Sequence, residues 1–142
     1  MADIQQSSAR RAAARELFAY LFVGGGAALA YVFASKFVLG LNLPIADWLI
    51  GGLLYGAFVP VVYLAHRLIS FRSEAPHSYA LPRYLAVQAG ALLVASGMSY
   101  IVYHVVNLQP GIGSAIVIVA SSGFSFVALR GWAFAEKALA AV

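Results

Sequence analysis

Residues 84–129 read YLAVQAGALLVASGMSYIVYHVVNLQPGIGSAIVIVASSGFSFVAL, a run of 46 residues without Asp, Glu, Lys or Arg. A helix needs about 20 residues to cross the hydrocarbon core of a membrane, so this run is too long for a single crossing. Its middle, residues 107–113 with the sequence NLQPGIG, combines polar residues with proline and glycine, a pattern typical of a turn. The run therefore predicts two transmembrane helices, over about residues 82–106 and 112–134.

Two further uncharged runs lie in the N-terminal half of the chain. Residues 17–35 and 48–66 each contain 19 residues without a formal charge, and they predict helices over about residues 17–39 and 46–66. The composition agrees, because 63% of the 142 residues are hydrophobic and only 10% are charged. Soluble domains have roughly 45–50% and 25% of these classes. We therefore expect an all-α membrane protein with four transmembrane helices.

The basic residues predict how these helices are oriented. Eight of the nine Lys and Arg residues fall on one expected side of the membrane, and Lys36 alone falls on the other. Basic residues concentrate on the cytoplasmic side, so we expect both termini to be cytoplasmic. Residues 1–14 would form a basic cytoplasmic segment and residues 15–142 the transmembrane domain. This placement also accounts for the net charge of +4 without nucleic acid as a partner. The eight residues are Arg10, Arg11, Arg15, Arg67, Arg72, Arg83, Arg130 and Lys137.

The sequence contains no residue pattern typical of a catalytic or metal-binding site. It has no cysteine, and the sequence offers no pair of carboxylates, no Ser/His/Asp set and no cluster of metal ligands. We expect no catalytic residue, no metal and no cofactor. Residues 17–35 lack the carboxylate that a four-helix drug/proton antiporter requires in its first helix, which disfavours ion-coupled transport. The same run is longer than the 7–15 apolar residues of a cleaved signal peptide, so we expect this helix to be retained.

An internal repeat links the two halves of the chain. Residues 63–71 (YLAHRLISF) and 126–134 (FVALRGWAF) both read aromatic-x-x-x-Arg-x-x-x-aromatic at the expected cytoplasmic ends of the second and fourth helices. Each pair of helices also opens with a basic residue before an apolar aromatic stretch, Arg15 in the first and Arg83 in the second. This pattern predicts two hairpins of the same orientation, as in a parallel repeat. The alternative is that the two segments match by coincidence, because arginine and aromatic residues are common where helices leave the membrane.

The doubled motif resembles that of the GtrA-like family, whose pattern Phe-x-x-x-Arg-x-Trp-x-Phe closes both even-numbered helices. The resemblance covers about residues 15–134. The second copy is complete, whereas the first has Ile69 where the tryptophan usually stands. The acidic residue often found within the first helix of the family is missing here.

This resemblance implies a function without catalysis. It implies that the protein moves a polyprenyl-phosphate-linked sugar between the leaflets of a bacterial inner membrane, for synthesis of a cell-surface polysaccharide or glycolipid. The alternative is a membrane anchor or accessory subunit that docks a polyprenyl-phosphate glycosyltransferase and transports nothing. The implied partners are the lipid-linked sugar, membrane lipids and such a glycosyltransferase. A homodimer stays open, because the small-residue motif Gly52-x-x-x-Gly56 could serve either internal packing or dimerisation.

Arginine is the residue type that best suits a phosphate headgroup. Guanidinium groups stay charged and can hold two phosphate oxygens at once. Arg67 and Arg130 occupy the repeated motif, so we expect them to form the site together. Membrane orientation and contact with lipid phosphates are the alternative explanation for every arginine. The remaining candidates are Arg83, Arg72 and Arg15 for phosphate, Phe71, Trp132 and Phe134 for the lipid tail or the interface, and Gln88 and His66 for a polar groove.

Overall fold

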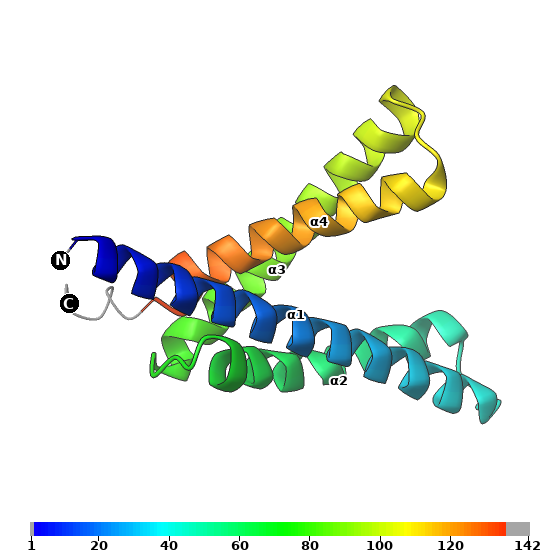
Figure 1. Cartoon of the computed structure of the whole chain (residues 1–142). Coiled ribbons are helices and arrows are strands. Elements are labelled where there is room, and N and C mark those ends of the chain that lie inside the picture. Colours follow the sequence, from blue (N-terminus) through cyan, green and yellow to red (C-terminus); the bar gives the residue numbers. More distant parts are fainter. Residues whose placement is uncertain (1, 136–142) are drawn as a thin grey trace. The chain divides into compact units, whose positions relative to one another are not determined.

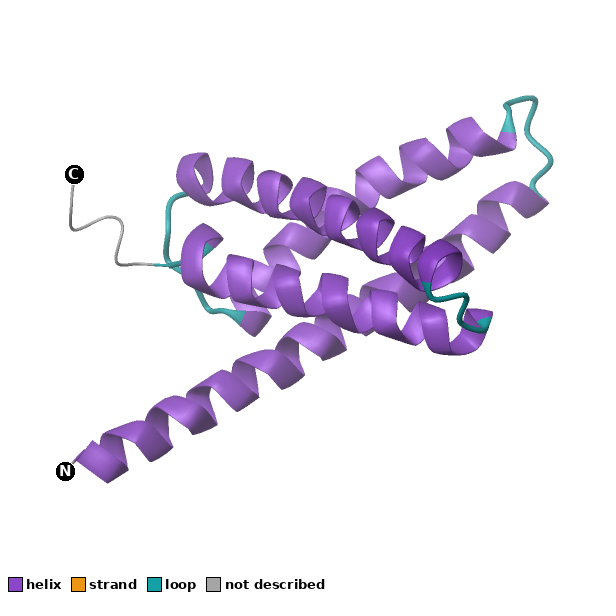
Figure 2. Ribbon diagram, turned by 90° about the horizontal axis from the view of Figure 1, so that it is seen from above, coloured by secondary structure: helices purple, strands orange, loops and turns teal. Residues whose placement is uncertain are grey.

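The computed structural model describes residues 2–135, and every regular element in that range is a helix (Figures 1 and 2). Three of the four long helices end in a short π-helical turn, in which a backbone N–H bonds to the carbonyl five residues earlier. Lys137, one of the predicted cytoplasmic residues, lies outside the described residues. The elements are α1 (Ala2–Gly40), α2 (Asp47–Ala65), η1 (His66–Ser70), α3 (His77–Tyr100), η2 (Ile101–Val105), α4 (Pro110–Ala128) and η3 (Leu129–Ala133).

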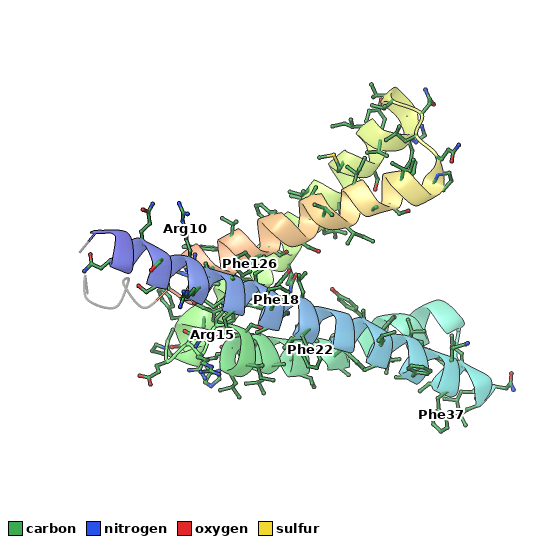
Figure 3. The ribbon with its side chains drawn as sticks, viewed as in Figure 1. Arg10, Arg15, Phe18, Phe22, Phe37 and Phe126 are labelled. Carbon is green, nitrogen blue, oxygen red and sulfur yellow. The ribbon has the colours of Figure 1, made fainter. Side chains whose placement is uncertain are left out.

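Four helical segments are long and apolar enough to cross a membrane, which confirms the predicted all-α fold with four transmembrane helices. Their surfaces fit a lipid environment. Phe18, Phe22 and Phe37 project from α1 in Figure 3, and each is at least 70% exposed. So much exposed apolar surface would be unstable in water and is covered by lipid tails in a membrane. The four segments are Gln5–Gly40, Leu49–Ser70, His77–Val105 and Pro110–Ala133.

The first helix is longer than its predicted span. It is continuous from Ala2, so residues 2–14 are helical turns that lead directly into the apolar stretch. Arg10 and Arg15 project from this N-terminal part of α1 (Figure 3). The assignment of residues 1–14 to the cytoplasm stays a prediction, as does the orientation of the other helices.

The chain divides into two compact units, and each is a helical hairpin. Unit 1 (Met1–Arg72) contains α1, α2 and η1, and unit 2 (Ser73–Val142) contains α3, η2, α4 and η3. In both units the two long helices pack against each other, and the first helix also contacts the π turn that ends the second. This arrangement agrees with the two hairpins predicted from the repeat.

Residues 41–46 connect the helices of unit 1. Asn42 adopts a left-handed backbone conformation with φ of 50°, and its side-chain amide donates a hydrogen bond to the Gly40 carbonyl (3.2 Å). Asparagine tolerates this conformation better than most residues, so it allows α1 to end and the chain to reverse. Tyr31 then joins the two helices, because its hydroxyl donates to the Gly51 carbonyl (3.2 Å) and its ring meets that of Phe58 edge-on at 5.7 Å.

The turn predicted over residues 107–113 is present in unit 2. Asn107 takes the left-handed conformation with φ of 57°, and the Leu108 N–H donates to the Val102 carbonyl (3.0 Å). The helices approach closely next to this turn. A β-carbon at Gly113 would lie 2.5 Å from Tyr103 Cε1 and 2.7 Å from Val102 Cγ1, so only glycine fits there without a shift.

Candidate functional site

Both copies of the repeated motif end their helices in the same unusual backbone turn. In η1 the Phe71 N–H donates to the His66 carbonyl (2.9 Å), and in η3 the Phe134 N–H donates to the Leu129 carbonyl (2.9 Å). Turns of this i→i+5 kind are rare, and they occur often at functional sites. The motif arginine is the second residue of the turn in each copy, and the final aromatic residue closes it. The repeat therefore extends from the sequence to the backbone.

In unit 1 an aromatic cluster packs around the π turn. The Tyr20 ring of α1 stacks on the His66 ring with centroids 4.8 Å apart, and it lies 6.2 Å from the Phe71 ring. His66 is only 4% exposed. Its Nδ1 atom shares a hydrogen bond of 3.1 Å with the buried Ser70 hydroxyl, one turn later. A buried polar group is costly unless it is hydrogen-bonded, so the His66–Ser70 pair satisfies a local requirement.

In unit 2 an arginine contacts the π turn. The Arg83 guanidinium of α3 lies over the Tyr79 ring at 3.5 Å and over the Trp132 ring at 5.1 Å. Its Nη1 atom also donates a hydrogen bond to the Trp132 carbonyl (3.3 Å). Guanidinium groups are attracted to the faces of aromatic rings. Arg83 therefore fastens the beginning of α3 to the π turn that carries Arg130.

The end of η3 is capped by side chains from the beginning of its own unit. The last carbonyls of a helix have no partner within the helix. Arg83 donates to the Trp132 carbonyl, and the Ser73 hydroxyl donates to the Phe134 carbonyl (3.1 Å). The Ser73 oxygen in turn accepts a hydrogen bond from the Ala75 N–H (3.3 Å). Two carbonyls at the end of the motif are thus satisfied by residues that lie 49 and 61 positions earlier in the chain, because the chain returns to the same end of the hairpin.

Ring contacts also set the register between the two copies. Tyr20 lies 6.2 Å from Phe71 in unit 1, and Tyr84 lies 6.4 Å from Phe134 in unit 2. The two tyrosines are thus equivalent, and Ala19 corresponds to Arg83. This register differs from the sequence interpretation, which paired Arg15 with Arg83 as the opening residues of the hairpins. The guanidinium clamp of unit 2 has no arginine counterpart at the equivalent position of unit 1.

The predicted arginines differ in their surroundings. Arg67 is half-buried on η1, and Arg130 is exposed on η3. Because they belong to different units, their shared phosphate site stays a prediction. Arg72 is exposed and has a left-handed backbone with φ of 48°, and Arg15 is exposed on α1.

The other predicted residues are placed within single units. His66 and Phe71 share the aromatic cluster of unit 1, with centroids 6.3 Å apart. Trp132 contacts Arg83 in unit 2, and Phe134 is buried against Tyr84. Gln88 is half-buried on α3, one turn beyond Tyr84.

Several residues that build these two ends were not among the predicted ones. Tyr79 is the clearest omission, although the four-residue spacing from Arg83 is the spacing at which helical neighbours meet. Ser70 stands at the same four-residue spacing from His66. Tyr20 and Ser73 carried no comparable signal, because their partners lie in distant parts of the chain. Only the folded backbone identifies them.

Comparison with known proteins agrees with the repeated motif. The family model described as GtrA/DPMS, transmembrane domain, matches residues 19–134, more than four fifths of the chain. The match includes both motif copies and all four transmembrane helices from Ala19 onward. No curated protein and no solved structure was found to match the chain. The family resemblance seen in the sequence is thereby confirmed.

Proposed function

Since this chain belongs to the GtrA/DPMS transmembrane-domain family, we propose that it moves a polyprenyl-phosphate-linked sugar between membrane leaflets. The family match supports a role in the synthesis of lipid-linked sugars or polysaccharides. Our proposal adds three points: transport of the lipid, a polyprenyl phosphate as its carrier, and the bacterial inner membrane as its location. The protein would act without catalysis, because translocation changes the position of a molecule and none of its bonds.

One observation carries this proposal: each hairpin ends in a π turn whose second residue is an arginine. Arg67 and Arg130 would hold the phosphate, since each guanidinium can engage two of its oxygens. Hydrogen bonds to charged groups are worth about 1.5–3 kcal/mol each, and water at the membrane surface reduces that value. Such affinity is enough to select a phosphorylated lipid and weak enough to release it.

Apolar side chains beside the arginines would accept the lipid tail. Leu68 and Ile69 next to Arg67 are more than half exposed, and Val127 and Trp132 near Arg130 are exposed as well. These surfaces fit an isoprenoid chain, which is apolar and branched. In a membrane such a chain would replace ordinary lipid tails at little cost, so its contacts add shape selectivity more than binding energy.

Reconstituted vesicles test the proposal. Purified full-length protein in vesicles should expose a labelled short-chain polyprenyl-phosphate sugar of the inner leaflet to an outside reagent, faster than protein-free vesicles do. Arg130→Ala should slow this exposure, because the motif loses its charge. The matched control is Arg11→Ala, which removes an exposed arginine of α1 outside the motif. Exposure no faster than in protein-free vesicles would contradict transport by this chain alone.

A second function is favoured by the composition of the family itself. The family model is named after DPMS as well as GtrA, and similar four-helix domains are fused to dolichol-phosphate mannose synthases. A chain of this family can therefore anchor or assist a polyprenyl-phosphate glycosyltransferase. In that case the vesicles would show no transport, while the protein would co-purify with a membrane glycosyltransferase and raise its activity.

A further inference from the structure

The Arg83 guanidinium is engaged by the protein itself. One face of the group is covered by the Tyr79 ring at 3.5 Å, and the Trp132 ring lies 5.1 Å away. Nη1 donates to the Trp132 carbonyl. A bidentate phosphate ligand must offer two donors of its planar edge to the anion. In Arg83 one edge donor is already directed at the protein backbone.

The contacts of Arg83 with Trp132 lead to the π turn that bears Arg130, whereas its contact with Tyr79 lies within α3. Trp132 is two residues after Arg130, and both belong to η3. Arg130 itself is exposed, so its guanidinium can meet a headgroup at the membrane surface. Fixing the Trp132 ring and carbonyl restricts the turn and hence the direction in which Arg130 extends. Pre-organisation of this kind lowers the entropy lost when a ligand binds.

We propose that Arg83 is a positioning residue, which clamps Trp132 and the π turn so that Arg130 presents its guanidinium to the polyprenyl phosphate. The identity of the ligand rests on the proposed function, whereas the clamp itself rests on the geometry alone. Tyr79 is the second member of the clamp, because its ring lies 3.5 Å from the guanidinium. This assigns Arg83 a role distinct from that of a phosphate ligand, and gives Tyr79 a role as well.

Tryptophan fluorescence tests the clamp without any ligand. The chain has two tryptophans, so Trp48→Phe leaves Trp132 as the single emitter in the full-length protein. Arg83→Lys should raise the quenching of Trp132 by acrylamide, because an ammonium covers the ring less completely than a planar guanidinium. Acrylamide is neutral, so the change reports access to the ring and not charge. Unchanged quenching would overturn the proposal, whether or not the lipid binds.

Tyr79 supplies a variant that alters the clamp and removes no charge. Tyr79→Leu should raise acrylamide quenching as Arg83→Lys does, since the guanidinium loses its aromatic support. Tyr79→Phe is the matched control. Within residues 2–135 no hydrogen bond reaches the buried Tyr79 hydroxyl, so the ring alone should matter. Helical circular dichroism and a single elution peak in detergent establish that each variant is folded. Equal quenching in Tyr79→Leu and Tyr79→Phe would contradict a role for the ring.

A double-mutant cycle distinguishes positioning from direct binding. The measured quantity is affinity for a short-chain polyprenyl phosphate in detergent. Arg83→Lys should weaken binding by up to about tenfold in the wild-type background, the size expected for coupled neighbours. It should cause no further loss when Arg130 is already alanine, because Arg83 then has no ligand group left to position. Independent, multiplying losses would show that Arg83 binds the phosphate itself and would overturn the proposal.

If the unmodified protein does not bind the polyprenyl phosphate, the proposed function fails, and the quenching results alone decide whether the clamp exists.

Discussion

The two hairpins end in the same backbone turn and support it with different side chains. In unit 1 the turn packs against stacked rings, Tyr20 on His66, and encloses the His66–Ser70 hydrogen bond. In unit 2 the corresponding turn has Leu129 and Ala133 at these positions, both fully buried, and a guanidinium clamp on its outer side. Leu129 and Ala133 in unit 2 thus occupy the positions equivalent to His66 and Ser70 in unit 1.

This difference separates what the repeat preserves from what it allows to vary. The arginine of the turn and the closing aromatic residue occur in both units, and the π turn itself occurs in both. The side chains that pack around the turn differ in kind between the two units. The copy with Trp132 has an arginine against it, whereas in unit 1 the position equivalent to Arg83 is Ala19. We therefore expect the arginine of the π turn to carry the function that the two units have in common. The side chains that pack around the turn would serve only the stability of their own unit.

The largest effect expected is an all-or-none one, and it tests whether the hairpins are parallel. The chain has no cysteine, so single cysteines at exposed positions can be labelled selectively. Asn42→Cys and Asn107→Cys, one in the loop of each hairpin, should both react from outside the cell, and Glu74→Cys should react only after permeabilisation. Reaction of the two loop cysteines from opposite faces would show that the hairpins are antiparallel.

The next effect concerns the motif arginines, of which each unit has one. Arg67→Lys and Arg130→Lys together should weaken polyprenyl-phosphate binding by about 100-fold, because two charge-assisted, bidentate contacts become point-charge contacts. Affinity for the uncharged polyprenol should not change. Isothermal titration in detergent measures both, with Arg11→Lys as the control. Equal losses for phosphate and alcohol would mean that the tail alone is recognised.

A smaller effect is expected from the close helix approach that distinguishes unit 2. Gly113→Ala should destabilise the protein by about 1–3 kcal/mol, since the added carbon overlaps Tyr103 and Val102. In unit 1, Gly51→Ala meets the nearest side-chain atom at 3.8 Å and should be tolerated. The midpoint of unfolding in a denaturing detergent titration gives the comparison. Gly123→Ala in α4, which has open space around it, serves as a helix-matched control.

The smallest effect tests whether the two kinds of packing are interchangeable. Ser70→Ala should cost about 1 kcal/mol, because the buried His66 ring loses its hydrogen-bond partner. The double variant His66→Leu/Ser70→Ala reproduces the pair found in unit 2, and it should recover most of that loss. The same unfolding titration measures both. If the double variant is less stable than Ser70→Ala, the His66 ring stabilises the protein through contacts other than its hydrogen bond to Ser70.

Much of the fold was predictable because its signals are large and local. Uncharged runs of 19 and 46 residues predict the number of crossings, and the Asn107 to Gly113 segment predicts the turn that the structure contains. The boundaries were less accurate. The third span was predicted to begin near residue 82, whereas α3 begins at His77 and continues through Pro82. That early start brings Tyr79 onto the helix, one turn before Arg83.

The candidate site was predictable only in part. The repeated arginines and aromatics are visible as a pattern, but a π turn has no residue signature in a single sequence, since it depends on one shifted backbone hydrogen bond. The equivalence of Tyr20 and Tyr84 was missed for a related reason. Side-chain packing sets it, and the more conspicuous Arg15 and Arg83 suggested a different register.

The self-contained hairpins have a consequence for how the protein is made. Each hairpin is joined by a short connection and holds its own helix contacts, such as Tyr31 to Gly51 in unit 1 and Gly113 to Tyr103 in unit 2. Chains generally fold unit by unit from the N-terminus during synthesis. The first hairpin can therefore leave the translocation machinery as a completed pair before the second has been fully translated. A ribosome that stalls within the second hairpin, after the first has cleared the exit tunnel, would already have delivered a finished half to the bilayer.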